Sequence, residues 1–108
     1  MNCIGLDLGT GTIKGVLWNP ADGIIASGKR TVPLLRPQEM FVEIDPATYF
    51  DTLYSLLEEL SGKSDSPIEG IAFAAASGNT LLCNENAVPQ TQIISWLDKR
   101  IDWMPPED

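Results

Sequence analysis

Two short glycine-containing turns divide the first third of the chain into three runs of strand-forming residues. The first run, Asn2–Leu8, ends at the turn Gly9–Thr12, and the second, Ile13–Trp18, is followed by the pair Asp22-Gly23. A third run, Ile24–Val32, contains enough β-branched residues for another strand. Glycine adopts positive φ without steric cost, so Asp-Gly between two such runs is typical of a hairpin. The sequence therefore predicts a three-stranded antiparallel meander.

A helix is predicted after the meander. Asp45 supplies a capping carboxylate, and Pro46 stands at the first helical position, where its missing N–H costs nothing. Gly62 is expected to end this helix in the left-handed conformation. Apolar residues recur at a spacing of three to four between these ends, and the predicted stripe consists of Phe50, Leu53, Leu57 and Leu60.

The rest of the chain is predicted to form further strands and the start of a second helix. Ile68–Ala76 is an almost continuous apolar run, which favours a strand buried on both faces. Ser77–Asn79 interrupts it, and shorter strands are expected at Thr80–Cys83 and Gln92–Trp96, with a helix beginning in Leu97–Trp103. The predicted fold class is therefore α/β, with a three-stranded antiparallel meander followed by a helix and further strands.

The composition excludes several classes of function. The chain has 108 residues, 44% of them hydrophobic, and 7 Lys+Arg against 15 Asp+Glu give a formal net charge of −8. This acidic balance argues against a nucleic-acid partner and against an anionic membrane. No apolar stretch approaches the ~18 residues that span a bilayer, and no basic segment marks a signal peptide, so a cytoplasmic location is predicted. The sequence contains no His, which excludes His-based catalysis. Cys3 and Cys83 lie in apolar runs and are interpreted as reduced core thiols.

The first turn has the composition of an anion-binding loop. Its glycines allow the backbone to come close to a ligand, and consecutive N–H groups in such a turn can surround phosphate oxygens. Asp7 stands where a carboxylate would hold Mg²⁺ beside those phosphates. The turn leads into a strand and lacks GxxxxGK[ST], so it is neither a P-loop nor a Rossmann turn. The alternative is a plain tight hairpin. The candidate phosphate- and ATP-binding residues are Asp7, Gly9, Thr10, Gly11, Thr12 and Lys14, with Asp7 also the candidate metal ligand.

Four segments resemble a known family. Ile4–Lys14 resembles the first phosphate hairpin of the actin, heat-shock-chaperone and sugar-kinase superfamily. Phe41–Pro46, with the aromatic-rich helix after it, resembles the Glu-x-Asp-Pro segment of the FGGY carbohydrate kinases, the xylulokinase and glycerol kinase group. Ile68–Leu82 is similar to their next strand and substrate loop, and Ile94–Arg100 to their Trp-x-Asp-x-Arg segment. The segments occur in the family's order and cover nearly the whole chain.

The resemblance implies an ATP-dependent kinase that phosphorylates a hydroxyl of a sugar or polyol, with ATP and Mg²⁺ bound in a cleft between two RNase H-like domains. The catalytic Asp and the adenosine pocket of these kinases lie beyond the part that this chain resembles. Residues 1–108 are therefore expected to be a partial N-terminal RNase H-like domain that lacks the second domain, and no catalytic residue is assigned. The implied substrate-binding residues are Ser77, Gly78, Asn79, Trp96, Asp98 and Arg100.

The substrate side leaves alternatives open. Where xylulokinase-like members carry Gln-Met-His, this chain has Ala75–Ser77, so a pentulose-like and a glycerol-like substrate both stay open. Trp96 is interpreted equally as a core residue or as a platform for the apolar face of a sugar. Asp98 and Arg100 lie two positions apart, which favours a structural ion pair over contact with a ligand.

Two further expectations concern partners. Without a covering helix, the strand around Ile71–Ala76 would expose an apolar face, which predicts a homodimer or association with the remainder of the kinase. The alternative to a kinase is a stand-alone, non-catalytic nucleotide-binding module of the same superfamily that acts through a partner.

Overall fold

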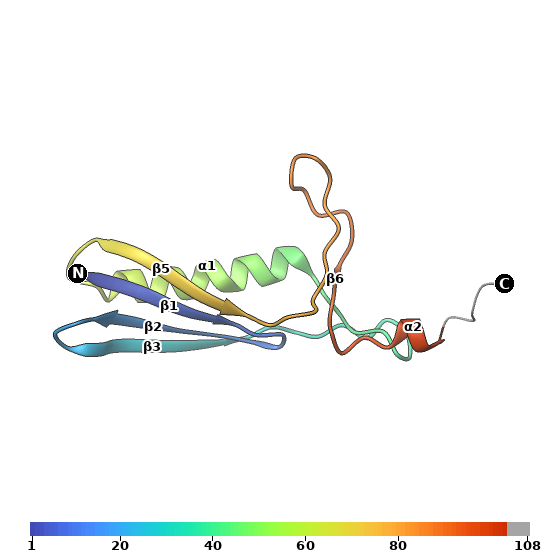
Figure 1. The fold of residues 1–108 in the computed structure, drawn as a ribbon, viewed down its shortest axis with the longest axis horizontal. Coiled ribbons are helices and arrows are strands. Elements are labelled where there is room, and N and C mark those ends of the chain that lie inside the picture. The colour runs from blue at the N-terminus through green and yellow to red at the C-terminus, as the bar shows by residue number, and fades with distance from the viewer. Residues whose placement is uncertain (104–108) are drawn as a thin grey trace.

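The first three strands form an antiparallel meander in the computed structural model, which describes residues 1–103 (Figure 1). They are β1 (Asn2–Leu8), β2 (Thr12–Asn19) and β3 (Gly23–Thr31). Gly23 has a φ of 72°, as the Asp-Gly turn requires. The predicted meander and its second turn are therefore confirmed.

A fourth strand, β5 (Ile68–Ala75), extends the sheet to the order β3-β2-β1-β5 and runs parallel to β1. The prediction that this strand is buried on both faces is wrong, because Ile71 is 54% and Phe73 68% exposed. The physical reason is that β5 lies at the edge of the sheet, while the helix α1 (Pro46–Gly62) packs on β2 and β3. The expected exposure of apolar side chains along this strand is confirmed.

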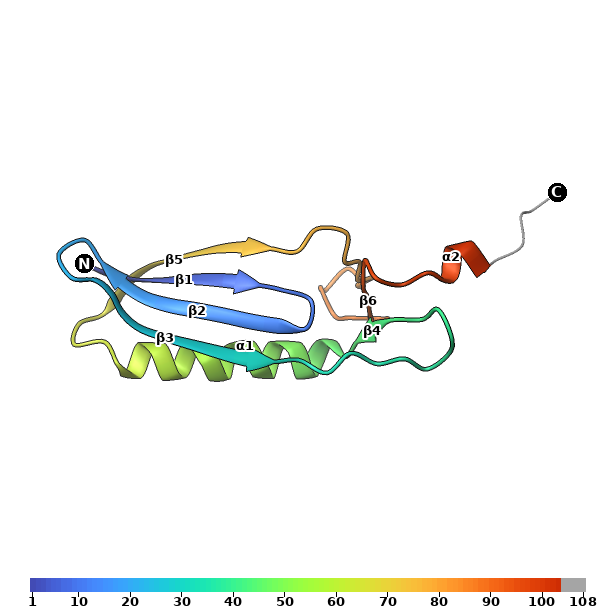
Figure 2. The ribbon, with the colours of Figure 1, turned by 90° about the horizontal axis from the view of Figure 1, so that it is seen from below.

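The helix α1 covers one face of the meander (Figure 2). The Asp45 side chain caps it by accepting a hydrogen bond of 3.0 Å from the Thr48 amide, and Pro46 begins it as predicted. The predicted stripe is partly wrong, because Phe50 is 44% exposed beside the exposed Tyr54, whose ring centroid lies 6.4 Å away. The core between helix and sheet contains the buried side chains Ile4, Leu6, Ile13, Leu17, Val32, Ile44, Leu56 and Leu60, with Tyr49, Leu53 and Leu57 packed against them.

The end of α1 also differs from the prediction. Gly62 is the last helical residue, and the cap is Lys63 with a φ of −91°, in the right-handed region. The Lys63 amide donates to the carbonyls of Leu60 and Ser61. The last turn therefore satisfies its carbonyls without a left-handed glycine.

The remainder of the described chain has little regular structure. β4 (Glu43–Ile44) pairs with β6 (Ile93–Ile94), and α2 (Arg100–Trp103) is a single turn, shorter than the predicted helix. The strand predicted at Gln92–Trp96 is thus reduced to two residues, and the one at Thr80–Cys83 to isolated bridges. The Asn84 side chain accepts hydrogen bonds from the amides of Asn86 and Val88, which forms a local turn in place of a longer ladder.

The prediction for the two cysteines has a mixed outcome. Both cysteines are free, but Cys83 is exposed and Cys3 half-buried, so neither is a buried core thiol. Within residues 1–103, no helix has the length and apolar character needed to cross a membrane.

Candidate functional site

The turn between β1 and β2 lies at the end of the sheet that faces β6 (Figures 1 and 2). Asp7 near the end of β1 is directly opposite Lys14 of β2, and both side chains are exposed. Because side chains alternate along a strand, Asp7 and Lys14 share the face of the sheet opposite to the buried Leu6 and to α1. Lys29 of β3 pairs with Lys14. A groove of about 700 Å³ along this face is lined by these three charged side chains and by Gly5, Val16 and Ala72 among others.

Gly9 and Tyr49 fix the backbone of the turn. A Cβ added at Gly9 would lie 2.5 Å from the carbonyl oxygen of Thr12, so a larger residue would force the turn to shift. The Gly9 carbonyl accepts a hydrogen bond of 2.8 Å from the Tyr49 hydroxyl of α1. Burial, together with the nearby charge of Asp7, raises the pKa of Tyr49, so its hydroxyl stays protonated as a donor. Gly11, in contrast, has only the Leu34 side chain within 4.0 Å.

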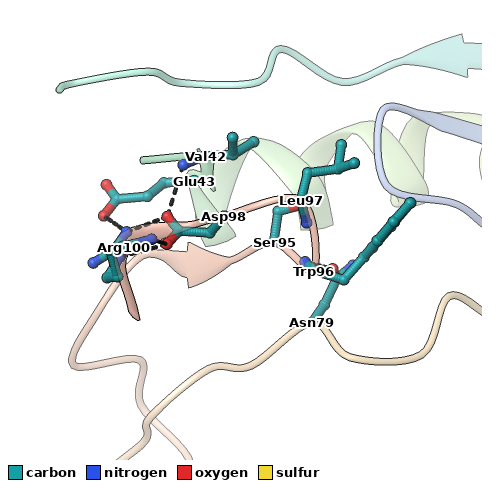
Figure 3. Close-up of polar contacts among 8 residues, drawn as sticks. All are labelled: Val42, Glu43, Asn79, Ser95, Trp96, Leu97, Asp98 and Arg100. Carbon is teal, nitrogen blue, oxygen red and sulfur yellow. Dashed lines mark hydrogen bonds and ion pairs between the residues drawn. The ribbon is translucent and has the colours of Figure 1, made fainter. Parts of the chain in front are cut away.

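Trp96 joins the turn to the predicted substrate segment. Its indole Nε1 donates a hydrogen bond of 2.9 Å to the Thr10 hydroxyl. Its backbone amide donates to Asn79 Oδ1 at 2.9 Å, which ties in the loop that also contains the exposed Ser77 and Gly78 (Figure 3). Trp96 is 54% exposed and is therefore not a core residue. The candidate phosphate turn and part of the candidate substrate segment thus lie side by side.

Asp98 and Arg100 form a second cluster next to this segment (Figure 3). The two oxygens of Asp98 accept from Arg100 Nε at 2.8 Å and from Arg100 Nη2 at 2.7 Å, and the Val42 amide donates to the same carboxylate at 2.7 Å. Arg100 Nη2 also lies 2.7 Å from Glu43 Oε2, and the guanidinium packs 4.0 Å from the centre of the Phe41 ring. The structural ion pair favoured by the sequence is present, and it joins Asp98, which precedes α2, to Arg100, the first residue of α2.

The electrostatics of this cluster follow from its hydrogen bonds. Arg100 holds the pKa of the Asp98 carboxyl well below its usual range, against the opposing effect of burial. Asp98 and Glu43 in turn raise the pKa of the Arg100 guanidinium. Because the Asp98 side chain is only 4% exposed and its oxygens already accept these bonds, the geometry favours a positioning role for this cluster.

Comparison with known proteins identifies the family. A family model described as the FGGY family of carbohydrate kinases, N-terminal domain, matches residues 2–104. The chain belongs to this FGGY family. A xylulose kinase from Staphylococcus epidermidis is 28% identical over 100 residues, and a glycerol kinase from Gloeobacter violaceus is 30% identical over 98 residues. Each match covers 90% of this chain but 20% of the relative, so the chain spans about a fifth of the length of these curated relatives.

Solved structures of FGGY kinases contain the same arrangement of elements. A ligand-bound xylulose kinase from Lactobacillus acidophilus and a gluconate kinase from the same organism each give a TM-score of 0.84 at 28% identity, over 90% of this chain and 20% of theirs. The predicted fold class is confirmed: this FGGY chain has the α/β arrangement of the N-terminal part of an RNase H-like kinase domain.

A Mg²⁺ site in this FGGY domain would depend on Asp7. Within residues 1–103, no group of three or more Asp, Glu or Cys side chains could hold a metal ion. Mg²⁺ in phosphate-transfer sites keeps several waters and is bound by one or two carboxylates together with substrate phosphates. The single exposed carboxylate of Asp7, beside the turn, fits that donor set.

Sequence reasoning missed several residues that shape the site. Phe41 and Glu43 belong to a segment that the sequence linked only to the family resemblance, yet both contact Arg100. For Glu43 the signal was its charge, which is opposite to that of Arg100, but 57 positions separate the two residues, so no local pattern reveals the pairing. Tyr49 belonged to the predicted aromatic helix, and its hydrogen bond to the turn had no signal in the sequence.

Proposed function

We propose that this chain is the N-terminal RNase H-like part of an ATP-dependent carbohydrate kinase, which transfers the γ-phosphate of ATP to a hydroxyl of a sugar or polyol. Membership of the FGGY family supports the reaction class. The single observation that carries the proposal is the hydrogen bond between Trp96 and Thr10, because it holds the candidate phosphate turn beside the candidate sugar segment. Phosphoryl transfer depends mainly on such positioning and on charge neutralisation.

The turn provides the phosphate half of the proposed site. The amides of residues 9–12 and the hydroxyls of Thr10 and Thr12 would donate to phosphate oxygens. Asp7 would hold Mg²⁺, which neutralises phosphate charge when it is bound. Lys14 lies on the same face as Asp7 and would add a positive charge near the phosphates.

The loop around Asn79 and the segment around Trp96 provide the sugar half. The exposed indole of Trp96 offers a flat apolar surface for the C–H face of a sugar. The Asn79 oxygen already accepts from the Trp96 amide, so the Asn79 NH₂ group would donate to a sugar hydroxyl, as would the exposed Ser77 beside Gly78. Asp98 and Arg100 would hold this segment in shape.

The proton acceptor would come from outside this chain. Asp7 is proposed as the metal ligand and not as the base, and the chain spans about a fifth of its curated relatives. We therefore propose that a second domain supplies the catalytic carboxylate and the adenosine pocket. The proposal also includes a cytoplasmic location and association with the rest of the kinase, with no nucleic-acid or membrane partner.

The test is a coupled assay of ADP release by the full-length product of the gene that encodes this chain. D-xylulose, glycerol and gluconate are the acceptors, since relatives are named as kinases of these compounds. We expect Mg²⁺-dependent ADP release with at least one acceptor. Asp7→Asn should lower kcat/KM by roughly 100-fold or more, because a metal contributes several kcal/mol of charge stabilisation.

Asp22→Asn is the matched control, because Asp22 is an exposed carboxylate in the β2–β3 turn at the other end of the sheet. It should leave kcat/KM unchanged. Nucleotide binding without ADP release for any acceptor would instead support the non-catalytic module.

A further inference from the structure

Trp96 contacts the proposed phosphate half-site through its side chain and the loop of the proposed sugar half-site through its backbone amide. The indole edge donates to Thr10 Oγ1 at 2.9 Å, across 86 positions of sequence. The side chain extends from its segment toward the β1–β2 turn (Figure 3). More than half of the residue remains exposed, so the indole has free surface while its N–H group is already bonded.

The direction of this hydrogen bond determines what Thr10 can do. An indole N–H can only donate, so the Thr10 hydroxyl oxygen must accept. Its own O–H hydrogen then points away from the indole and is available to a different acceptor. In a turn that receives phosphate, this leaves the hydroxyl oriented as a donor to an anionic oxygen.

The backbone of Trp96 is fixed by contacts with neighbouring segments. Asn79 Oδ1 accepts from its backbone amide at 2.9 Å, and Gly78, at a φ of 88°, passes so close that an added Cβ would lie 3.1 Å from Trp96 Cβ. The preceding Ser95 is buried, and its amide donates to the Val42 carbonyl at 3.0 Å. The backbone is therefore fixed, and the indole orientation depends on Thr10 and on whatever covers the exposed surface.

We propose that Trp96 couples the sugar half-site to the phosphate half-site. A sugar packed on the exposed indole immobilises it, and the immobilised N–H group keeps the Thr10 hydroxyl directed at the phosphate. Sugar and nucleotide then strengthen each other's binding by the same factor, as linkage requires. One hydrogen bond is worth roughly a 3- to 10-fold effect. This inference rests on the proposed kinase function.

The experiment measures that coupling factor directly. The Kd of the non-hydrolysable ATP analogue AMP-PNP with Mg²⁺ is determined by calorimetry on the full-length protein, with and without a saturating concentration of the acceptor that gives the highest rate. Trp96→Phe keeps the aromatic face and removes the N–H group. We expect its coupling factor to fall to about 1. The smaller phenyl face also weakens acceptor binding, so the Kd of the acceptor alone is measured separately and the test is the coupling factor.

Thr10 provides the reciprocal variants. Thr10→Val should abolish coupling, Thr10→Ser should retain it, and the Trp96→Phe/Thr10→Val double variant should be no worse than either single one. Trp18→Phe is the matched control, since Trp18 is a partly exposed tryptophan on β2 without a part in the proposed site. It should leave coupling unchanged.

The outcomes separate this proposal from the proposed function. If the wild type binds both ligands but Trp96→Phe retains the coupling, or weakens only acceptor binding, the coupling role is wrong and the kinase stands. If the wild type binds no nucleotide, the kinase function fails and this proposal fails with it. An indole ¹⁵N–¹H spectrum gives an independent readout, because Thr10→Val must shift the Trp96 resonance, and an unshifted resonance overturns the hydrogen bond.

Discussion

Two parts of this chain are held in shape by different kinds of contact. In residues 2–62, the sheet and α1 enclose an apolar core in which Ile13, Leu17, Leu56 and Leu60 are fully buried. Between residues 76 and 102 of the described chain, Ser95 is the one buried residue. That second part is shaped by directional polar contacts around Asn79, Asn84 and Asp98.

Because of this difference, the phosphate turn is supported by an apolar core, whereas the substrate segment owes its shape to individual hydrogen bonds. An apolar core tolerates the loss of a surface contact, because its stability comes from many small dispersion and burial terms. A segment that depends on a few hydrogen bonds changes shape when one of them is lost. Single substitutions in residues 76–103 can therefore alter the substrate side while the sheet and its turn stay folded.

The largest expected effect comes from the same substitution placed once in each part. Leu60→Ala removes a fully buried side chain and should lower the free energy of unfolding by about 2–5 kcal/mol, the cost of lost burial plus a cavity. Leu82→Ala removes a side chain that is 59% exposed and should cost less than about 0.5 kcal/mol. Urea unfolding followed by circular dichroism measures both. Similar losses would show that the two parts form one equally packed unit.

Residues 2–62, the packed part of the chain, were predicted well from the sequence, because hydrophobic periodicity and turn residues indicate their structure directly. The alternating strands, the Asp22-Gly23 turn and the Asp45 cap were all visible as local patterns. The errors in this part concern which strands of the sheet the helix covers. Nothing local shows that α1 packs on β2 and β3, so the apolar run Ile68–Ala76 was interpreted as buried although β5 is an edge strand.

Residues 76–102, the polar part of the chain, were predicted less well, because their hydrogen bonds do not follow a repeating spacing in the sequence. The predicted strand at Thr80–Cys83 failed because Asn84 bonds to nearby amides and forms a turn. Asp98 and Arg100 were correctly paired from their spacing, but Glu43 and the Val42 amide, which complete the cluster, come from a distant segment. The candidate binding residues themselves remain predictions until ligand binding is measured.

A substitution of Asp98 tests whether the polar part opens independently of the core. Asp98→Asn removes the charge and replaces one of the two acceptor oxygens by an NH₂ group, so the side chain can no longer accept from both Arg100 nitrogens and the Val42 amide in the same way. Hydrogen exchange at the Val42 and Arg100 amides should accelerate by roughly tenfold or more, because the free energy of local opening falls by about 1–3 kcal/mol. Amides of β1 and β2 should exchange as in the wild type.

Asp102→Asn provides the control for that measurement. Asp102 is an exposed carboxylate in α2, two residues beyond Arg100. Its substitution should leave the Val42 and Arg100 amides unchanged. Faster exchange across β1 and β2 in Asp98→Asn would mean that the two parts unfold together.

The pH dependence of stability provides a smaller test of the same cluster. Because Arg100 lowers the folded-state pKa of Asp98, the unfolded chain binds a proton at this site at a higher pH than the folded chain does. The contribution of Asp98 is therefore complete above its unfolded pKa of about 3.9 and is lost as the pH falls further. Urea unfolding from about pH 6 to pH 3 should show a shallower decline for Asp98→Asn than for the wild type. Parallel declines would mean that the ion pair contributes nothing to stability.

The smallest effect is expected from the hydrogen bond by which Tyr49 of α1 holds the β1–β2 turn. Tyr49→Phe keeps the ring against the core and removes the hydroxyl that donates to the Gly9 carbonyl at 2.8 Å. The free energy of unfolding should fall by about 0.5–1.5 kcal/mol, and exchange of the amides in residues 9–12 should accelerate. Tyr54→Phe, at an exposed position of the same helix, should change neither quantity. If Tyr49→Phe left the turn amides unchanged, the turn would be held by its own strands and by Trp96, and the packed part would not control the geometry of the phosphate half-site.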